Sequence, residues 1–430
     1  MAYQEPERQQ FHFSSRKGWL NDPNGLCFHQ GTYHLFYQHN PAAVHWGPMH
    51  WGHATGTDLI HWQEQPIALY PDESGVMFSG CAVVDEQNLT GLGVDPASPP
   101  LLFFYTCAGK PFTQNLAYSL DGGRTVVKYA RNPVVPNLHG GEERDPSVAF
   151  DPASGTWRMA LYLGNERGDE RGDFALLESA DLLNWRETAL FRIPNGGREC
   201  PELFQIADKT DGKLRWAILE ANGNYLVGDI TDGRFQAEHA GIFMHRSGLK
   251  GGYAGQTFKN PPDGRRLYIA WQQDYIRGDA FSQSMTLPVE LKLVGGELRV
   301  HPAAETRLLH AGEAQQFRDV STVNADGELW ELEFETPLHG VMLNIAGTDL
   351  WIDSAAGVLR CNAGEYPLPH TEKPLRWRAW LDRNTLELFE SEGRFWLPLP
   401  VQRRPEPVIS VPQGGPLAAV TLRPLQTIWR

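Results

Sequence analysis

Five stretches of the sequence follow one plan, and this repetition constrains the fold more than any other feature. Each combines a short motif, an apolar run typical of a strand, a tight turn and a second apolar run, except that a loop over residues 85–100 replaces the turn in the second stretch. The motifs recur at steps of about 60 residues, somewhat above the period of common propeller repeats. Their marker residues are Asp22, Ser79, Asp145, Glu199 and Gln256. Because helical periodicity is almost absent, the pattern predicts an all-β fold that begins with a five-bladed β-propeller over residues 1–294.

A different architecture is predicted after the repeats. Gly295-Gly296 and His301-Pro302 indicate a boundary. We expect a linker over residues 295–316, in which residues 303–316 could form a short helix. From residue 317, runs of alternating polarity such as LWELEFE and TLELFES are typical of a β-sandwich. A β-sandwich domain is therefore expected over residues 317–430, and a chain of 430 residues is long enough for two domains.

The composition limits the partners and the cellular compartment. Hydrophobic residues make up 41% and charged residues 21% of the chain, as in folded globular proteins. A net charge of −14 disfavours nucleic acid or an anionic membrane as a partner, and no apolar run approaches the ~20 residues of a membrane span. The five cysteines have no paired spacing, and the N-terminal stretch has no apolar signal-peptide core. We therefore expect free thiols and a cytoplasmic location.

The first motif, WLNDPNG, occupies residues 19–25 and precedes two predicted strands. The three residues that follow Asp22 are turn formers, so we expect a turn that directs Asp22 at the start of the first strand. In a propeller the first strand of every unit lines the central channel, and equivalent motifs then lie at the same mouth. Asp22, Asp145 and Glu199 should therefore meet in one pocket.

Three carboxylates in one pocket suit the cleavage of glycosidic bonds, where one carboxyl protonates the leaving oxygen and another attacks or activates water. A calcium or magnesium site would need several oxygen ligands in one loop, and the sequence has no such loop. His45, His50 and His53 could suggest zinc, but neither a cysteine pair nor a further ligand is spaced to complete a site. The nucleophile elbow, the phosphate loop and the dinucleotide fingerprint are also absent. We therefore expect no metal and no cofactor.

The motifs WLNDPNG, FSG, RDP and ECP, in this order and spacing, resemble glycoside hydrolase family 32, which contains invertases, levanases and inulinases. Stretches such as HLFYQHNP, WGPMHWGHATGTDLIHW and QNLAYSLDGGRT support the resemblance, which begins at residue 11 and ends near residue 300. The fold of that family is a five-bladed propeller followed by a β-sandwich. The resemblance implies a retaining, exo-acting β-fructofuranosidase that works through a covalent fructosyl-enzyme intermediate. Its expected partners are small sugar substrates, namely sucrose and fructooligosaccharides, with inulin and levan as further candidates.

The resemblance also implies a role for each motif residue. Asp22 would be the nucleophile, and Glu199 would be the acid and then the base. Asp145 would stabilise the transition state, with Arg144 beside it as donor and charge partner. Cys200, next to the acid, is expected only to pack. The residues that would bind the sugar are Trp19, Asn21, Gln38, Trp46, Phe78, Ser79, Arg144, Tyr253 and Trp271.

Three departures from the family pattern affect the expected substrate preference. Cys81 follows FSG where serine is usual, Ala270 precedes Trp271 where glycine is usual, and Val289 stands where arginine is common. They leave the three carboxylates unchanged, but they put in question the rim and the leaving-group side, where water and sugar acceptors are distinguished. A fructosyltransferase is therefore kept as an alternative, and so is a non-catalytic fructan-binding protein.

Overall fold

The computed structural model describes residues 3–164, 172–194, 198–248, 250–276, 278–402 and 407–429. Apart from one 3-10 helix, every regular element in this part of the chain is a β-strand, which confirms the predicted all-β class. The strands form seven sheets. The described residues contain no helix that is long and apolar enough to cross a membrane.

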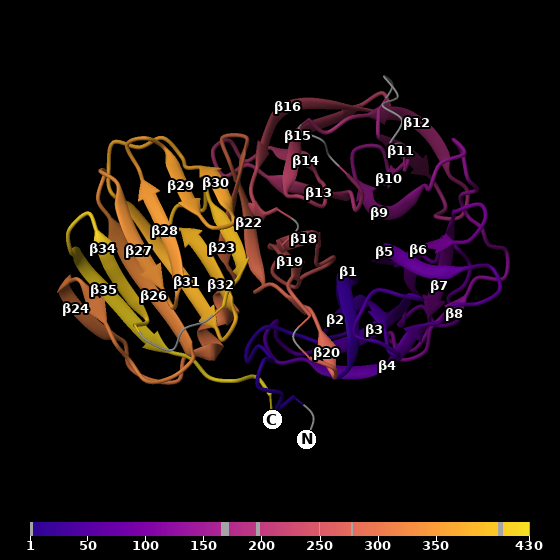
Figure 1. Ribbon diagram of the computed structural model, residues 1–430. Helices are drawn as coiled ribbons and strands as arrows, with labels where there is room; N and C mark the ends of the chain where they lie inside the picture. The colour runs from indigo at the N-terminus through magenta and orange to yellow at the C-terminus, as the bar shows by residue number, and fades with distance from the viewer. Residues whose placement is uncertain are drawn as a thin grey trace.

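Five sheets occupy residues 18–302, and each contains one repeat of the sequence. In chain order their main strands are β1 (Gly18–His29), β2 (Thr32–Asn40), β3 (His50–Gly56) and β4 (Gln63–Leu69); β5 (Val76–Val84), β6 (Leu101–Ala108), β7 (Thr113–Ser119) and β8 (Val127–Lys128); β9 (Arg144–Asp151), β10 (Thr156–Tyr162), β11 (Phe174–Ser179) and β12 (Arg186–Phe191); β13 (Glu202–Ala207), β14 (Leu214–Leu219), β15 (Asn224–Thr231) and β16 (Arg234–Ile242); and β17 (Arg246–Ser247), β18 (Lys250–Thr257), β19 (Arg266–Gln273), β22 (Val289–Val294) and β23 (Glu297–Pro302). Figure 1 shows the sheets set around a common centre, with β1, β5, β9, β13 and β18 innermost.

Backbone hydrogen bonds join the first sheet to the segment that follows the fifth repeat. β1 pairs in parallel with β20 (Phe281–Ser282), and Gly18 lies opposite Phe281. At the other end of β1, the N–H of Phe28 donates to the carbonyl of Lys259 at 2.8 Å, and the N–H of Lys259 donates to the carbonyl of Leu26 at 2.9 Å. The beginning and the end of the repeat region are therefore held together by main-chain contacts.

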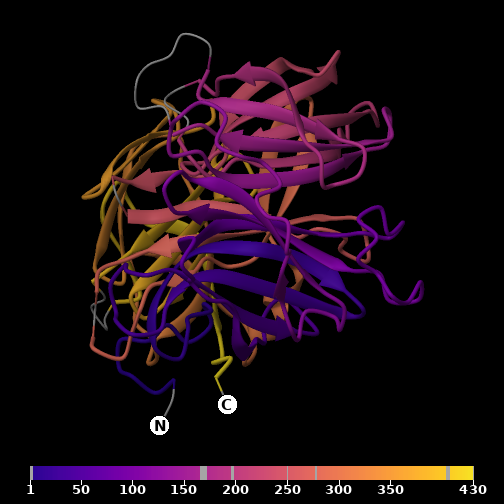
Figure 2. The same cartoon turned by 90° about the vertical axis from the view of Figure 1, so that its right-hand side faces the viewer.

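The rest of the chain forms two six-stranded sheets that pack face to face. One contains β24 (Gln315–Val320), β26 (Leu329–Thr336), β31 (Leu375–Asp382), β32 (Thr385–Glu390), β33 (Trp396–Pro400) and β35 (Leu417–Pro424), and the other contains β25 (Thr322–Val323), β27 (Val341–Ile345), β28 (Thr348–Asp353), β29 (Val358–Cys361), β30 (Gly364–Pro367) and β34 (Ile409–Gln413). Both sheets contribute to one apolar core, for example through Leu332 and Trp377 from the first and Leu343 from the second. Figure 2 shows these orange and yellow sheets behind the five sheets of residues 18–302.

The segment between the two parts is shorter than the expected linker. β23 pairs with β22 along its whole length, so the fifth sheet continues to Pro302, beyond the boundary expected at residue 294. A 3-10 helix, η1 (Ala304–Leu309), lies where a short helix was expected, and β24 begins at Gln315. The glycine pair at 295–296 forms the turn between β22 and β23, and Asp208 Oδ1 and Oδ2 accept its two N–H groups at 2.9 and 2.8 Å.

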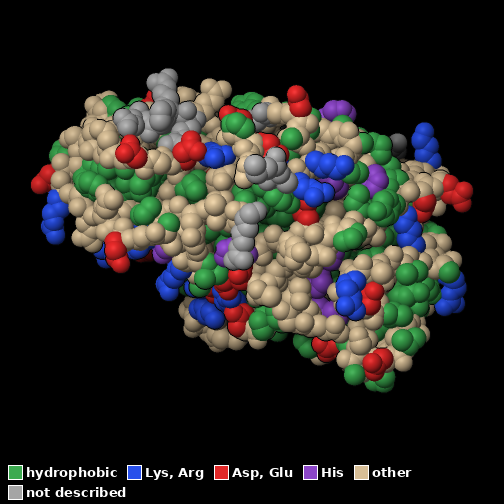
Figure 3. Space-filling model, turned by 90° about the horizontal axis from the view of Figure 1, so that it is seen from below, with side chains coloured by type: hydrophobic (Ala, Val, Ile, Leu, Met, Phe, Trp, Pro, Cys, Tyr) green, Lys and Arg blue, Asp and Glu red, His purple; other side chains and the backbone are tan. Residues whose placement is uncertain are grey.

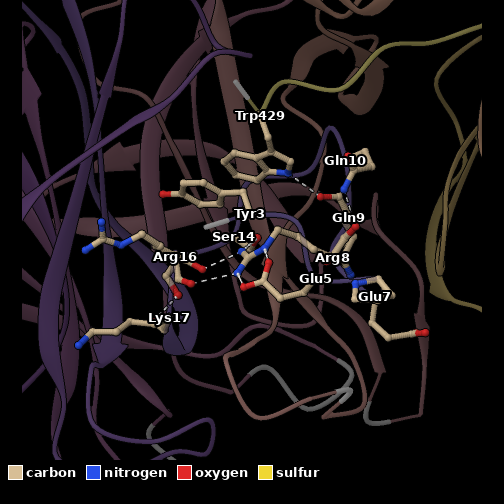
Figure 4. A network of polar contacts seen from close by, with 12 residues as sticks. Tyr3, Glu5, Glu7, Arg8, Gln9, Gln10, Ser14, Arg16, Lys17 and Trp429 are labelled. Carbon is tan, nitrogen blue, oxygen red and sulfur yellow. Dashed lines mark hydrogen bonds and ion pairs between the residues drawn. The ribbon is translucent and has the colours of Figure 1, made fainter. Parts of the chain in front are cut away.

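The N-terminal segment docks against the last residues of the chain (Figure 4). The side chain of Arg8 is fully buried, with its guanidinium 3.6 Å from the centroid of the Phe281 ring and in an ion pair with Glu5 at 2.6 Å. Beside it, the ring of Tyr3 stacks on Trp429 at a centroid distance of 4.3 Å. These contacts fix the first residues of the chain on β20 and on the C-terminal segment.

A second contact of the N-terminal segment is a buried polar cluster formed by His12, Asp382 and Glu387. His12 Nδ1 lies 2.8 Å from Asp382 Oδ2, and its Nε2 lies 2.9 Å from Glu387 Oε1. All three side chains are fully buried. The Asp382 carboxylate also accepts the N–H groups of Gln10 at 2.6 Å and Phe11 at 2.8 Å. This cluster connects the six-stranded sheets to the segment that precedes β1.

Surface charge is mixed on the face of the molecule shown in Figure 3, where Lys and Arg side chains alternate with Asp and Glu. Cross-strand ion pairs such as Arg376–Glu335 and Arg360–Glu365 lie between exposed side chains. Exposed pairs of this kind contribute little to stability because water and salt screen them.

Candidate active site

The backbone of β1 directs Asp22 through a β-bulge. The ladder between β1 and β2 changes register between Leu20 and Pro23, so Asp22 lies in the irregular stretch, and Pro23 is paired again with Tyr37. A bulge re-aims one side chain and increases the local twist of a strand. The prediction of a turn at this motif is therefore wrong, because pairing with β2 keeps the DPNG residues within a continuous strand. Gly25 has a φ of 54° and takes up the left-handed conformation this geometry requires.

Equivalent irregularities occur at the same end of the other inner strands. Register shifts fall between Met77 and Gly80 on β5 and between Tyr253 and Gln256 on β18. In the third and fourth repeats the backbone is left-handed, with φ of 64° at Asp145 and 29° at Glu199. Non-glycine residues hold such angles only where surrounding contacts enforce them, and these positions cluster at functional sites.

Asp22 and Asp145 are connected through the side chain of Cys200, and Ser79 binds Asp22 as well. Ser79 Oγ donates to Asp22 Oδ2 at 2.7 Å. Cys200 Sγ lies 3.6 Å from the same oxygen and 3.4 Å from Asp145 Oδ2, and the Cys200 N–H donates to Asp145 Oδ2 at 3.0 Å. Cys200 therefore contacts both carboxylates. The sequence analysis predicted only packing for this residue, although its position next to Glu199 was a usable signal.

Burial, together with the crowding of carboxylates, raises the pKa values of Asp22 and Asp145. Burial, reinforced by the charge of Glu199, raises the pKa of Asp22 to about 6, against the opposing hydrogen bond from Ser79. Burial also raises the pKa of Asp145, and the charges of Glu199 and Asp22 add to this effect while Arg144 opposes it. Shifts of this kind, caused by burial together with identified charges, are typical of catalytic carboxylates.

Glu199 is held by donors from two other sheets. Arg144 donates to Glu199 Oε2 through Nε at 3.1 Å and through Nη2 at 2.8 Å, and the hydroxyl of Tyr253 donates to Oε1 at 2.6 Å. The distance from Arg144 Nε to Asp145 Oδ2 is longer, at 3.7 Å. Arg144 is therefore the charge partner of Asp145, as expected, but its hydrogen bonds go to Glu199, which was not expected.

Arg246 supports this arrangement, and sequence reasoning missed it. Its guanidinium carbon lies 4.0 Å from the centroid of the Tyr253 ring, and its two terminal nitrogens donate to Asn222 Oδ1 and Gln273 Oε1. The guanidinium thereby holds the face of the tyrosine that donates to Glu199. No local motif marks Arg246, because its partners come from distant parts of the chain.

Aromatic residues surround the carboxylates on two sides. Trp271 makes edge contacts with Trp19 at 5.8 Å and with Tyr253 at 6.1 Å, and Trp19 Nε1 donates to Asn21 Oδ1 at 2.8 Å. On the other side Trp46 is 55% exposed and meets Phe78 at 6.1 Å. These predicted sugar-binding residues therefore have aromatic surface available at the carboxylate cluster.

Two further residues change the sequence-based view of this rim. Phe112, which was not predicted, packs on Phe78 at 5.7 Å. Gln38 is buried, and its amide donates to the carbonyl of Met77 at 2.9 Å, so it links β2 to β5. Its position at the bulged end of β5 still places it among the residues expected to bind sugar.

The three departures from the family pattern lie inside the molecule. Cys81, Ala270 and Val289 have exposed fractions of 1%, 0% and 0%. Cys81 Sγ accepts the N–H of Val148 at 3.1 Å, so it joins β5 to β9. The expectation that these residues affect the rim is therefore not supported by their positions, since side chains packed in the core do not line it.

The histidines considered for zinc make other contacts. His53 pairs with His34 at 3.1 Å, and the Nδ1 atoms of His45 and His50 face the carbonyls of Trp46 and Pro48. Within the described ranges, no group of three or more His, Cys, Asp or Glu side chains is placed to hold a metal ion.

Three buried or half-buried carboxylates at one end of a ring of sheets, with donors and aromatic surface around them, define a glycoside hydrolase. Residues 12–302 match the model of the glycosyl hydrolases family 32 N-terminal domain, and the chain belongs to this family. A levanase from Bacillus subtilis is 29% identical over 99% of this chain and 72% of its own length. An exo-inulinase from Aspergillus niger is 38% identical over 64% of this chain and 59% of its own length.

A solved structure extends the likeness to the whole fold. The exo-inulinase of Aspergillus awamori superimposes with a TM-score of 0.86 at 24% identity, and the match covers 100% of both chains. A fructan beta-fructosidase from Streptococcus mutans is 41% identical over 54% of this chain but only 16% of its own length. The chain thus spans between 16% and 72% of the length of these curated relatives.

Proposed function

We propose that the chain is a retaining, exo-acting β-fructofuranosidase that releases terminal fructose from sucrose, fructooligosaccharides, inulin and levan. The observation that carries this proposal is the connected set of carboxylates, in which Cys200 contacts Asp22 and Asp145 while Arg144 and Tyr253 hold Glu199. Membership of family 32 and the names of the levanase and exo-inulinase relatives support the choice of fructosides.

In this proposal the three carboxylates divide the reaction between them. The Asp22 carboxylate attacks the anomeric carbon of the terminal fructose, and Glu199 gives its proton to the leaving glycosidic oxygen. Glu199 then removes a proton from water, which attacks the same carbon and breaks the bond to Asp22. Asp145 accepts hydrogen bonds from hydroxyls of the ring, and Arg144 orients Glu199. Trp19, Asn21, Gln38, Trp46, Phe78, Ser79, Tyr253 and Trp271 surround the bound fructose.

We further propose that the five sheets of residues 18–302 are the blades of a closed five-bladed β-propeller and that the two six-stranded sheets form a β-sandwich. The parallel pairing of β1 with β20 and the contacts between Phe28 and Lys259 support closure of the ring. All five cysteines are free thiols, which supports a reducing, cytoplasmic compartment.

Product analysis on sucrose, 1-kestose, inulin and levan tests the activity. Fructose should appear from the first turnover with each substrate, in equal amounts with glucose from sucrose, and Glu199→Gln should lower kcat on sucrose by about three orders of magnitude. Glu335→Gln, on an exposed side chain of β26, is the control and should keep the parent rate. Glucose in clear excess over fructose would indicate transfer to sugar, and four intact substrates would refute catalysis.

A further inference from the structure

The inner strands end in a second cavity that the proposed reaction does not use. It has a volume of about 530 Å³ and is lined by the last residues of β5, β9 and β13 and by residues 257–260, at and beyond the end of β18. On β9, Asp145 lies at the catalytic end and Ala149 in this cavity, a separation of about 13 Å along the strand. The cavity therefore lies at the opposite end of the same strands, and we call it the far-mouth cavity.

A buried network separates the two ends. Glu202 is fully buried, and its Oε2 accepts Ser147 Oγ at 2.9 Å while its Oε1 accepts Lys259 Nζ at 2.8 Å and the hydroxyl of Thr257. Ser147, Glu202 and Thr257 come from β9, β13 and β18, so the network joins three of the innermost strands between the two ends. A sugar in the far-mouth cavity would therefore not be a substrate on its way to Asp22.

An aromatic pair forms one wall of the far-mouth cavity. Phe150 and Trp157 lie directly opposite each other on β9 and β10, with ring centroids 5.2 Å apart, and Phe150 is 41% exposed. The indole N–H of Trp157 is buried and has no hydrogen-bond acceptor among the described residues. Exposed aromatic faces of this kind suit a ring that has an apolar face and polar edges.

Arg266 supplies hydrogen-bond donors to the far-mouth cavity. Its Nε donates to the carbonyl of Gln205 at 2.5 Å, which fixes the guanidinium at the wall. Burial lowers the pKa of Arg266, as expected for a cation with little compensating charge. The amides of Gln87, Gln205 and Asn260 also line the cavity. Guanidinium and amide groups supply several hydrogen bonds in fixed directions, which fits hydroxyl groups.

The charges around the far-mouth cavity decide between a neutral and an anionic ligand. Its charged lining residues are Asp85, Glu86, Lys259 and Arg266, two of each sign. Lys259 is already paired with Glu202, and Asp85 accepts the N–H groups of residues 89 and 90. A phosphate or carboxylate would therefore meet no net positive field, whereas a neutral sugar needs none.

We propose that the far-mouth cavity is a second, non-catalytic binding site for a neutral sugar ring, stacked on Phe150 and Trp157 and held by Arg266. The loop over residues 85–100 contributes Asp85, Glu86, Gln87 and Leu89 to its wall, which gives this long connection between β5 and β6 a purpose. The choice of a fructooligosaccharide as ligand rests on the proposed function.

Indole signals in ¹H–¹⁵N spectra test the site in the full chain carrying Asp22→Asn, which prevents hydrolysis. Titration with 1-kestose should shift the signal of Trp157, assigned by its loss in Trp157→Phe, in a saturable way. Trp19, whose indole donates to Asn21, reports the catalytic end separately. Trp377, whose indole donates to Thr336 Oγ1 at 2.9 Å in the six-stranded sheets, should not shift.

Variants sharpen the test. Arg266→Ala and, separately, Phe150→Ala should raise the 1-kestose concentration for half of the Trp157 shift at least tenfold; Phe150 is partly exposed, so its truncation leaves the fold intact. Arg265→Ala is the matched control, because Arg265 pairs with Asp263 and Glu305 instead, and it should leave that concentration unchanged.

Each outcome bears on one of the two proposals. A Trp157 signal that stays fixed while Trp19 saturates overturns the second site and leaves the proposed function standing. A Trp157 shift without any Trp19 shift supports the second site and contradicts the proposed function. A Trp157 shift with fructose 6-phosphate but none with 1-kestose overturns the neutral-sugar assignment.

Discussion

Two clusters of buried carboxylates in this protein differ in how their charge is balanced. At the contact with the six-stranded sheets, Asp382 and Glu387 enclose His12 and also accept backbone or indole N–H groups. At the catalytic end, Asp22, Asp145 and Glu199 lie together, and Arg144 is the one cation among the described residues that forms ion pairs with them, reaching Asp145 and Glu199. With His12 protonated, the first cluster has one cation for two carboxylates, whereas the second has one cation for three.

The pKa values reflect this difference. Burial alone lowers the pKa of His12, but the hydrogen bonds and charges of Asp382 and Glu387 outweigh it and raise that pKa to about 9. At the catalytic end, burial and like charge raise the pKa of Asp22 to about 6. The same residue type thus stabilises the fold where its charge is satisfied, and becomes reactive where it is not.

The largest expected effect is the loss of activity in Asp22→Asn. Without a nucleophile, kcat on sucrose should fall by at least about three orders of magnitude. Because the charged form of Asp22 is disfavoured in the folded state, the free energy of unfolding at pH 8 should rise by about 1–3 kcal/mol. Sucrose assays and urea unfolding measure the two effects. A variant with one tenth of the parent activity would refute the nucleophile assignment.

Asp382→Asn should lower stability and leave the activity of the folded enzyme unchanged. Removing this charge leaves His12 with one carboxylate and weakens acceptance of three backbone N–H groups, so the free energy of unfolding should fall by about 3–5 kcal/mol. Activity per folded molecule should remain at the parent level. Glu335→Gln, from the exposed pair with Arg376, is the control and should change stability by about 0.5 kcal/mol or less. Equal losses of stability in Asp382→Asn and Glu335→Gln would contradict the stabilising role of the His12 cluster.

The His12 cluster should also make stability fall at alkaline pH. Its folded-state pKa of about 9 lies above the ordinary value of 6.5, so its contribution is complete below pH 6.5 and is lost as pH rises through 9. A shift of this size corresponds to about 3 kcal/mol. Urea unfolding at pH 6, 8 and 10 measures it, and His12→Gln should lack this decline. A parallel decline in His12→Gln would assign the effect to other groups.

The smallest effect concerns Ser79→Ala. The Ser79 hydroxyl lowers the pKa of Asp22, so the nucleophile should be protonated at a higher pH without it. The acid limb of the pH profile of kcat/KM, expected near pH 6 in the parent, should move up by about 0.5–1 pH unit. An unchanged or lower midpoint would show that Ser79 does not act on Asp22 through this hydrogen bond.

Sequence reasoning located the carboxylates because their motifs recur at equivalent positions of the repeats. It failed where the outcome depends on partner strands, as in the bulge at Asp22, whose register is set by β2. It also missed Arg246, whose contacts with Asn222 and Gln273 cross 24 and 27 residues of chain. Long-range pairings such as these have no local pattern from which they could be inferred.

The docking of the N-terminal segment has a consequence for how the chain is made. Trp429 Nε1 donates to the carbonyl of Gln9 across 420 residues, and Asp382 binds Gln10 across 372. During synthesis the first segment emerges long before the residues that cover it. Contacts between residues so far apart in the sequence form late, so residues 8–12 should stay open to proteases until the segment over residues 382–429 has been made. Synthesis of residues 382–429, and not of the five repeats, then sets when this segment becomes protected.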